Sequence, residues 1–588
     1  MKTTFGLGCV LCASLGMADE AKTGDQALDR FYRAYLESDF ALRPLQATRC
    51  GDHRFDGRID DLSAAARAAR LAQVRQTLDA LPRAVDYAQL SRPAQIDYEI
   101  LRDALVTDLW QSENIRRFED DPRVYGDYTT ECVFLLFTQS SLPKAANIEH
   151  AIARMAQVPR VLADARANLR NPPRVVAETA IKQNLGAIAF YEREVFLLAG
   201  EDAPSGALKA AAQQAADALR QHQQFLEKEL LPRATGEWRI GQAKFAEKFE
   251  RELAAGVTAE QNLADAEAEF ERVTRDMYVL ARQLWSACES KCPLPPDDAA
   301  GRRETIRRVL AEISRNHAEP QALVSEAQAT VAHLKRFIAD KGLLQLPEPD
   351  RCQIREMQEF LRGNSVADLR CAPPLDPEMP SLYSISPPPK DWPPERVKSF
   401  VEEYNRQALQ VLTIHEAYPG HYVQLSHANR NPSLIRRVCG SDVFAEGWAV
   451  YCEKMMLDEG YGGGDIALRL AGLKFYLRAV ANSILDYKMH CANMSDEEAL
   501  RFLTEDAFQA EGEARLKVIR AKQSSVQLSS YFVGRMAFVR LRQQVQREMG
   551  EAFSLRRFHQ ALLESGSLPV RFLPEVVRMK LKEERHEP

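Results

Sequence analysis

The segment that most constrains this chain is residues 413–424, which read TIHEAYPGHYVQ. His415 and His421 are six residues apart, and on an unbroken helix six steps of about 100° would leave their side chains about 120° apart. Rings that diverge this far cannot share one metal ion. Between them lie Pro419, which lacks a backbone donor and disfavours helical angles before it, and Gly420, which adopts angles that other residues avoid. The segment therefore predicts a helix that is opened locally.

The same segment carries the side chains that a zinc hydrolase needs. Two imidazoles supply neutral nitrogen ligands, and Glu416 beside them supplies a base. A break that returns His421 to the side of His415 would place all three groups around one ion. The spacing by itself suits equally well two unrelated histidines on either side of a turn.

A third ligand is predicted in the segment AEGWAVYCE, residues 445–453. Glu446 begins a helical pattern of apolar residues. One class of zinc peptidase takes its third ligand from a glutamate on the helix after the His-Glu helix and leaves the fourth position to water. Glu446 suits that role, although a carboxylate in the first turn of a helix is also stabilised by the helix dipole alone.

Further motifs accompany these two. They are ATRCGDHRFD at 47–56, Arg478 with DYKMH at 486–490, and QLSSY at 527–531 followed by Gly534. Taken together, the motifs resemble a largely bacterial family catalogued as domain of unknown function 885, which has zincin-like metallopeptidase character. The likeness runs over most of the chain.

The resemblance implies an all-α, gluzincin-like metallopeptidase fold. In that fold His415, His421 and Glu446 would hold one zinc ion, and Glu416 would polarise the catalytic water. Two departures from the family pattern stand out. The family usually has Pro-Gly before the QxxxY segment, where this chain has Ser525-Val526, and Tyr422 replaces the second of two paired histidines.

The resemblance also implies roles for residues outside the central motif. His490 would face the site as a catalytic group, and Asp486, four residues earlier on the same helical face, would support it. An ordinary helix-surface pair is the alternative explanation. Arg478 and Glu453 are expected to have supporting roles.

Substrate-binding candidates come from residues 520–535. Tyr531 is the first choice for a donor to the negative charge that develops on an attacked carbonyl oxygen. Gln527 offers an amide, and Arg520 or Arg535 could bind a terminal carboxylate through a planar guanidinium, which would make the enzyme a carboxypeptidase. Arginines on helix faces are more commonly just solvated.

A short strand-like fragment, SLYSIS at 381–386, stands in a proline-rich stretch before the central motif. An exposed strand offers the donors and acceptors that a bound peptide backbone needs, so Tyr383 to Ser386 could hold substrate near the metal. A loop that merely covers the site is an equally good explanation. This fragment predicts the small β element of an otherwise helical fold.

The rest of the chain has helical spacing. Apolar residues recur every three or four positions, as in ALDRFYRAYL at 27–36, and Pro394 begins a helix whose pattern continues to His415. No linker marks a domain boundary. We therefore expect one helical body over 19–588, with the catalytic part at about 375–588.

Residues 1–18 have the pattern of a cleaved secretory leader, with Lys2, a short apolar run and small residues before Asp19. The run is too short to favour a membrane span, so a soluble periplasmic or secreted product is predicted, with a frayed cytosolic N-terminus as the alternative. Export permits disulfides among the nine remaining cysteines, and the candidate pairs are Cys288 with Cys292 and Cys352 with Cys371.

The predicted function is that of a zinc-dependent peptidase acting on short peptides, of carboxypeptidase or dipeptidyl carboxypeptidase type. A formal charge of −6 gives no broad basic surface and argues against nucleic acid as the main partner. Two alternatives use the same residues. One is a zinc amidase acting on a non-peptide or modified amino-acid conjugate, and the other is a catalytically silent periplasmic binding protein with the same fold.

Overall fold

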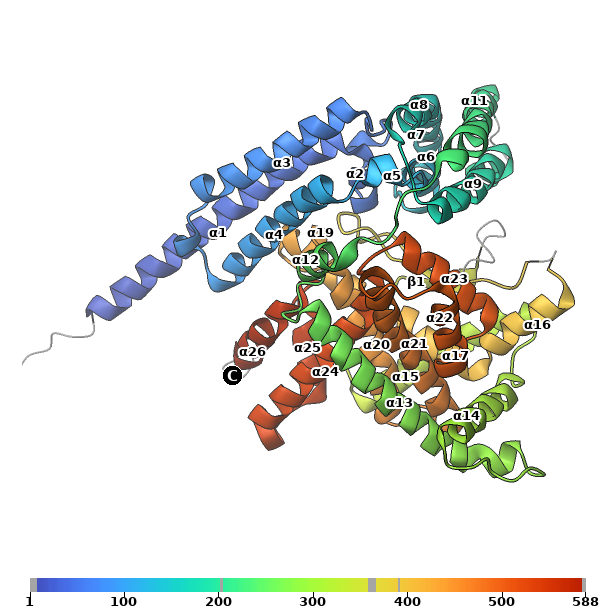
Figure 1. Ribbon diagram of the computed structural model, residues 1–588. Coiled ribbons are helices and arrows are strands. Elements are labelled where there is room, and N and C mark those ends of the chain that lie inside the picture. Colours follow the sequence, from blue (N-terminus) through green and yellow to red (C-terminus); the bar gives the residue numbers. More distant parts are fainter. Residues whose placement is uncertain (1–7, 201–204, 358–365, 390–391, 584–588) are drawn as a thin grey trace, which may run out of the picture. The chain divides into compact units, whose positions relative to one another are not determined.

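The computed structural model describes residues 8–200, 205–357, 366–389 and 392–583 (Figure 1). Within these residues the protein is mostly helical (74%) with one three-stranded sheet, which confirms the predicted all-α class with a small β element. It forms two compact units, whereas one helical body was expected from the sequence. The N-terminal unit comprises residues 1–236, 373–376 and 431–439, and the C-terminal unit comprises 237–372, 377–430 and 440–588.

The N-terminal unit begins with three long helices that lie side by side, drawn in blue in Figure 1. Serines start two of them: the Ser63 and Ser91 hydroxyls accept hydrogen bonds from the backbone N–H groups three residues on. A second group of helices follows, and its members pack against one another. The principal helices are α1 (Gly8–Leu42), α2 (Pro44–Cys50), α3 (Ala64–Ala84), α4 (Arg92–Asn114), α6 (Arg123–Thr138), α7 (Lys144–Met155), α8 (Val158–Asn168), α9 (Arg174–Ala189), α11 (Gly206–Phe225) and α19 (Leu434–Val438).

The predicted leader, residues 1–18, lies partly outside the described residues. From Gly8 onward, the backbone of this segment forms the beginning of α1. Among the helices that the structure describes, none combines the length and apolar character needed to cross a bilayer.

The C-terminal unit is built around α21 (Ile466–Cys491), which packs along α13 (Ala259–Cys288). Both helices contribute to one large apolar core that includes Met277, Leu477 and Phe532. The other principal helices are α12 (Gly241–Leu253), α14 (Ala299–Ser314), α15 (Leu323–Lys341), α16 (Pro394–Glu403), α17 (Arg406–Glu416), α18 (His421–Ala428), α20 (Asp442–Asp458), α22 (Asp496–Arg501), α23 (Glu511–Gln523), α24 (Ser530–Met549), α25 (Leu555–Leu563) and α26 (Leu573–Glu583).

Helices α20 and α24 cross at a pair of glycines. A Cβ atom on Gly447 would lie 2.4 Å from the carbonyl carbon of Gly534, and one on Gly534 would lie 2.2 Å from the carbonyl oxygen of Val443. Only glycine leaves enough space for backbones to approach this closely. The crossing sets the position of α20, the helix that carries Glu446.

The sheet has the strand order β1–β3–β2, with β1 at Cys352–Glu356, β2 at Ala367–Arg370 and β3 at Ser381–Ile385. Strand β3 runs parallel to β1 and antiparallel to β2. Both of its edges are therefore occupied by neighbouring strands. The prediction that Tyr383 to Ser386 binds a peptide backbone is wrong for this reason: the fragment is the central strand and offers no free edge.

None of the nine cysteines from Cys50 onward, all of which lie in the described residues, forms a disulfide. Cys352 lies opposite Ser381 on β1, whereas Cys371 follows β2, so the central strand separates the two. Strands on either side of a central one are about 9–10 Å apart, beyond the roughly 7 Å between Cα atoms that a disulfide spans. Cys288 and Cys292 are likewise unbonded, and neither predicted bridge is present.

Candidate metal centre

The predicted break in the helix falls between α17 and α18. Helix α17 ends at Glu416 and α18 begins at His421, so the two histidines belong to separate helices and not to one bulged helix. Gly420 makes this turn possible, because a Cβ atom there would lie 1.8 Å from the carbonyl oxygen of His415. The helix expected to run unbroken from Pro394 into this motif also divides, and Asn405 caps the start of α17 by accepting a hydrogen bond from Ala408 N–H.

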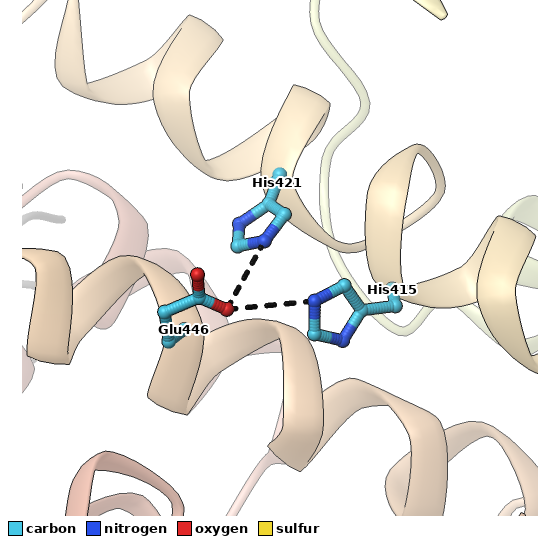
Figure 2. A group of neighbouring side chains, drawn as sticks. All are labelled: His415, His421 and Glu446. Carbon is cyan, nitrogen blue, oxygen red and sulfur yellow. Dashed lines mark ion pairs between the residues drawn. The ribbon is translucent and has the colours of Figure 1, made fainter. Parts of the chain in front are cut away.

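The break brings the three predicted ligands together (Figure 2). Glu446 Oε2 lies 3.5 Å from His415 Nε2 and 3.5 Å from His421 Nε2. The imidazole rings are nearly perpendicular, at 88°, and one donor atom from each of the three residues lies within 4.8 Å of the others. A distance of 3.5 Å is long for a hydrogen bond. It is close to the roughly 3.3 Å that separates two ligands of a tetrahedral zinc ion with bonds of about 2.0–2.1 Å.

Two buried atoms of this group have no hydrogen-bond partner in the described structure: Glu446 Oε2 and His421 Nδ1. Buried polar atoms are nearly always hydrogen-bonded, so an orphaned carboxylate oxygen aimed at two imidazoles calls for an explanation. A cation at that point would satisfy it. Two neutral nitrogens and one carboxylate oxygen are a donor set suited to zinc, and a fourth position would remain for water.

Glu453 fixes the orientation of one imidazole from behind. Its Oε1 lies 2.7 Å from His415 Nδ1, and its side chain is buried. A proton shared on this side leaves the Nε2 lone pair directed at Glu446, as in the carboxylate–histidine pairs of metal sites. Burial would lower the pKa of His415, but the neighbouring carboxylates of Glu446 and Glu453 raise it well above its ordinary value.

Glu416, the last residue of α17, lies beside the ligand set. Burial raises the pKa of its carboxyl group, with smaller contributions in the same direction from Glu446 and Asp368, while His415 and His421 oppose the shift. A carboxylate with a raised pKa takes up a proton more readily near neutral pH. The environment of Glu416 therefore suits a general base.

Tyr531, Arg520 and Gln527 come together near the centre. Burial raises the pKa of the Tyr531 phenol, the charge on Glu446 raises it further, and Arg520 and His415 lower it, so the phenol lies among these groups. Arg520 Nη2 donates to Gln527 Oε1 at 2.8 Å. Arg520 thus lies beside both Gln527 and the Tyr531 phenol, which are the other predicted substrate and oxyanion residues of this segment.

His490 lies elsewhere. Its Nε2 is 2.9 Å from the carbonyl oxygens of both Ala521 and Ser524, and its ring packs against Trp238 and Phe245. A nitrogen engaged with two backbone carbonyls cannot also donate to a substrate. The structure assigns His490 to holding the end of α23, and the predicted oxyanion role is not supported.

Asp486 does not pair with His490 but holds the next turn of chain. This buried carboxylate accepts hydrogen bonds from the Val526 N–H and the Ser529 hydroxyl, each at 3.0 Å. Val526 has a positive φ of 71°, a region that favours glycine. The turn that leads to Tyr531 therefore has a glycine-like conformation at a valine.

Three other predicted residues make contacts with side chains of the protein itself. Tyr383 is fully buried with its hydroxyl 3.1 Å from Thr413 Oγ1, so the structure does not support a substrate-binding role for its side chain. Arg535 is 3% exposed, lies 3.5 Å above the Tyr476 ring and 3.4 Å from Glu269, so the structure does not support a substrate-binding role for it. Arg478 forms an ion pair with Glu513.

Two residues that contact the connector between α17 and α18, residues 417–420, were not predicted from the sequence. Trp448 Nε1 donates to the carbonyl oxygen of Pro419 at 2.8 Å, and Asp350 accepts from Tyr418 and Tyr422. Trp448 lies within a motif that the sequence analysis singled out, whereas Asp350 stands in a proline-rich stretch with no periodicity to mark it. His427, another histidine near the motif, contacts the carbonyl oxygen of Gln345 at 3.0 Å.

A family model described as a bacterial protein of unknown function (DUF885) matches residues 44–577. Among solved structures, the chain is similar to a candidate lipoprotein of unknown function from Shewanella oneidensis, with 29% identity, a TM-score of 0.79, and 94% of this chain and 99% of that chain covered. A candidate lipoprotein from Colwellia psychrerythraea shares the fold at 17% identity and a TM-score of 0.76, with 95% and 100% covered. No curated protein matches the chain. The chain belongs to the DUF885 family of bacterial proteins.

Proposed function

We propose that this protein is a zinc-dependent peptidase of gluzincin type that hydrolyses short peptides. The observation that carries the proposal is the convergence of His415, His421 and Glu446, with the half-buried carboxyl group of Glu416 beside them. A binding protein has no use for a base at this point. When bound, the ion would lower the pKa of a water molecule and polarise the carbonyl group of an amide.

The residues around the ion divide the remaining work. The Glu416 carboxylate takes the proton of the attacking water and passes it to the leaving nitrogen. Glu453 Oε1, 2.7 Å from His415 Nδ1, holds the imidazole in the orientation in which Nε2 would face the ion. The Tyr531 hydroxyl donates to the carbonyl oxygen, on which negative charge grows as the bond breaks.

Two basic residues of α23, one of them beside Tyr531, support a carboxypeptidase mode of action. Arg520 lies next to the phenol, and Lys517 is buried one turn earlier on α23. Burial, followed by the charges of Arg478 and Arg520, lowers the pKa of Lys517 to about 7. An anionic group between Lys517 and Arg520 would be stabilised by both, and the C-terminal carboxylate of a peptide is such a group.

An extracytoplasmic location fits this function. The two similar solved proteins are described as candidate lipoproteins, and the leader predicted over residues 1–18 would direct this chain across the membrane. Short peptides are available substrates in that compartment.

The test is product analysis by mass spectrometry, using a mixed peptide library and the zinc-loaded protein. We expect peptides shortened stepwise from their C-terminal ends, by one or two residues, and no products from Glu416→Gln loaded with the same amount of zinc. Peptides with amidated C-termini are the matched control for the carboxylate and are expected to react at least tenfold more slowly. Equal behaviour of the wild type and Glu416→Gln on every peptide would reject the enzyme. Hydrolysis confined to non-peptide amide conjugates would indicate an amidase instead.

A further inference from the structure

The connector between the two histidine ligands controls their geometry. His415 lies in the last turn of α17 and His421 opens α18, so the separation of their imidazoles depends on residues 417–420 and not on the regular geometry of one helix. A group that fixes this connector therefore fixes the metal ligands.

Asp350 contacts the connector from one side. The Tyr418 hydroxyl lies 2.7 and 2.8 Å from the two carboxylate oxygens of Asp350, and the Tyr422 hydroxyl lies 2.8 Å from Oδ1. Both tyrosine side chains are 1% exposed, and their ring centroids are 5.2 Å apart. Tyr422 directly follows His421, so the carboxylate binds one residue within the connector and one in the first turn of α18.

Asp350 is itself held in place by two other elements. Lys335 Nζ, on α15, lies 2.5 Å from Oδ2, and the backbone N–H of Cys352, the first residue of β1, donates to Oδ1 at 3.1 Å. Burial alone would raise the pKa of Asp350, but the hydrogen bonds from Lys335, Tyr418 and Tyr422 outweigh burial and lower it. The group is an ionised acceptor tied to the sheet and to a packed helix.

A second contact holds the connector through its backbone. Trp448, which is fully buried on α20, donates its indole N–H to the carbonyl oxygen of Pro419 at 2.8 Å. Glu446 is two residues earlier on the same helix. Asp350 and Trp448 therefore hold the connector between the sheet side and the helix of the third ligand.

We propose that Asp350 is a positioning residue of the metal centre, which sets the separation of His415 and His421 through the hydroxyl groups of Tyr418 and Tyr422. The inference rests on the proposed function, because it takes His415, His421 and Glu446 to hold zinc. Asp350 acts through the tyrosines and contacts neither the ion nor a substrate.

The experiment measures zinc affinity by competition with a chromophoric chelator. The variants are Asp350→Ala and a double variant with Tyr418→Phe and Tyr422→Phe, which keeps both rings and removes only the hydroxyls. Both are expected to bind zinc about 10–100-fold more weakly than the wild type, as when second-layer contacts of a metal site are lost. Asp350→Asn keeps one acceptor oxygen and should lose less.

A control and a spectroscopic readout separate positioning from general damage. Glu378→Gln removes the exposed ion pair of Arg351, next to Asp350, and should leave zinc affinity unchanged. The visible absorption of the cobalt-loaded protein, which reports ligand geometry, should change in the Asp350 and tyrosine variants and not in Glu378→Gln. If Asp350→Ala does not fold by circular dichroism, the double tyrosine variant carries the test.

The outcomes are distinct. A double tyrosine variant that binds zinc within twofold of the wild type, with an unchanged cobalt spectrum, would overturn the role of Asp350 and leave the zinc enzyme standing. A wild-type protein that binds no zinc would overturn the proposed function itself.

Discussion

Glu453 Oε1 lies 2.7 Å from His415 Nδ1, on the side of the imidazole opposite to Glu446. Replacing this carboxylate by an amide in Glu453→Gln weakens the acceptor that orients the ring, so zinc affinity should fall about 10–100-fold. Competition with a chromophoric chelator measures the change. Asp458→Asn is the matched control, since Asp458 lies on the same helix in an exposed ion pair with Lys454, and its zinc affinity should match that of the wild type.

Zinc binding should strengthen as pH rises. Against the effect of burial, the neighbouring carboxylates of Glu446 and Glu453 raise the pKa of His415, so the metal must displace a proton from a more basic imidazole. Affinity is expected to increase as pH rises towards the pKa of His415 and then to level off. Isothermal titration calorimetry in buffers of different ionisation enthalpy counts the released protons. In Glu453→Gln, zinc affinity should stop rising at a lower pH than in the wild type. An unchanged dependence of zinc affinity on pH would contradict this account.

His53 provides a pH-dependent contact within the N-terminal unit. Its Nδ1 lies 2.8 Å from Asp56 Oδ2 and its Nε2 lies 3.4 Å from Asp376 Oδ2. Burial would lower the pKa of His53, but the two carboxylates raise it. Because the folded-state pKa is raised, the contact stabilises fully below the unfolded value, about 6.5, and this stabilisation is lost as pH rises through the folded-state pKa.

The variant His53→Gln should therefore lower the free energy of unfolding by about 1–2 kcal/mol at pH 5 and by less at pH 8. Urea unfolding at the two pH values measures the difference. His317→Gln is the control, because His317 Nδ1 contacts the backbone carbonyl oxygen of Ala318 in place of a carboxylate. Equal losses at both pH values would show that protonation of His53 has no part in stability.

At Val526 the glycine variant should be more stable than the alanine variant, which reverses the usual order within helices. Its φ of 71° disfavours any residue with a Cβ atom, so Val526→Gly should be more stable than Val526→Ala by about 1 kcal/mol, although glycine also loses the buried β-carbon that alanine keeps. The matched site is Val480, buried within α21, where alanine should be more stable than glycine by about 1 kcal/mol. Thermal unfolding compares the four variants, and the same order at both sites would refute the assigned strain.

The glycine crossing of α20 and α24 should not tolerate a methyl group. A Cβ atom at Gly447 would lie 2.4 Å from backbone, so Gly447→Ala should destabilise the protein by about 1–3 kcal/mol or more and weaken zinc binding through displacement of α20. At Gly186, within α9, an added Cβ atom would meet no neighbouring atom of the described residues within 4 Å, and Gly186→Ala should stabilise by about 0.5–1 kcal/mol. Differential scanning calorimetry measures both; an unchanged midpoint in Gly447→Ala would show that the helices can separate without cost.

Much of the fold could be predicted because its determinants are local. The three- and four-residue spacing of apolar positions specifies helices, and Pro419-Gly420 specifies a break, since both depend on neighbours along the chain. The division into two units could not be predicted, because no composition change marks Gly236 and because short segments at 373–376 and 431–439 join a unit that begins far away in sequence.

The placement of the site residues shows the same limit. The sequence alone determined which side chains are able to bind a metal and that an unbroken helix could not bring His415 and His421 together. Tertiary structure decided that the strand of Tyr383 is the central one and that His490 faces the backbone of α23. It also decided that Asp350 accepts a hydrogen bond from Tyr418 in the connector, 68 residues later in the sequence. These contacts join segments that are distant along the chain, and such packing depends on the whole core and not on any local pattern of residues.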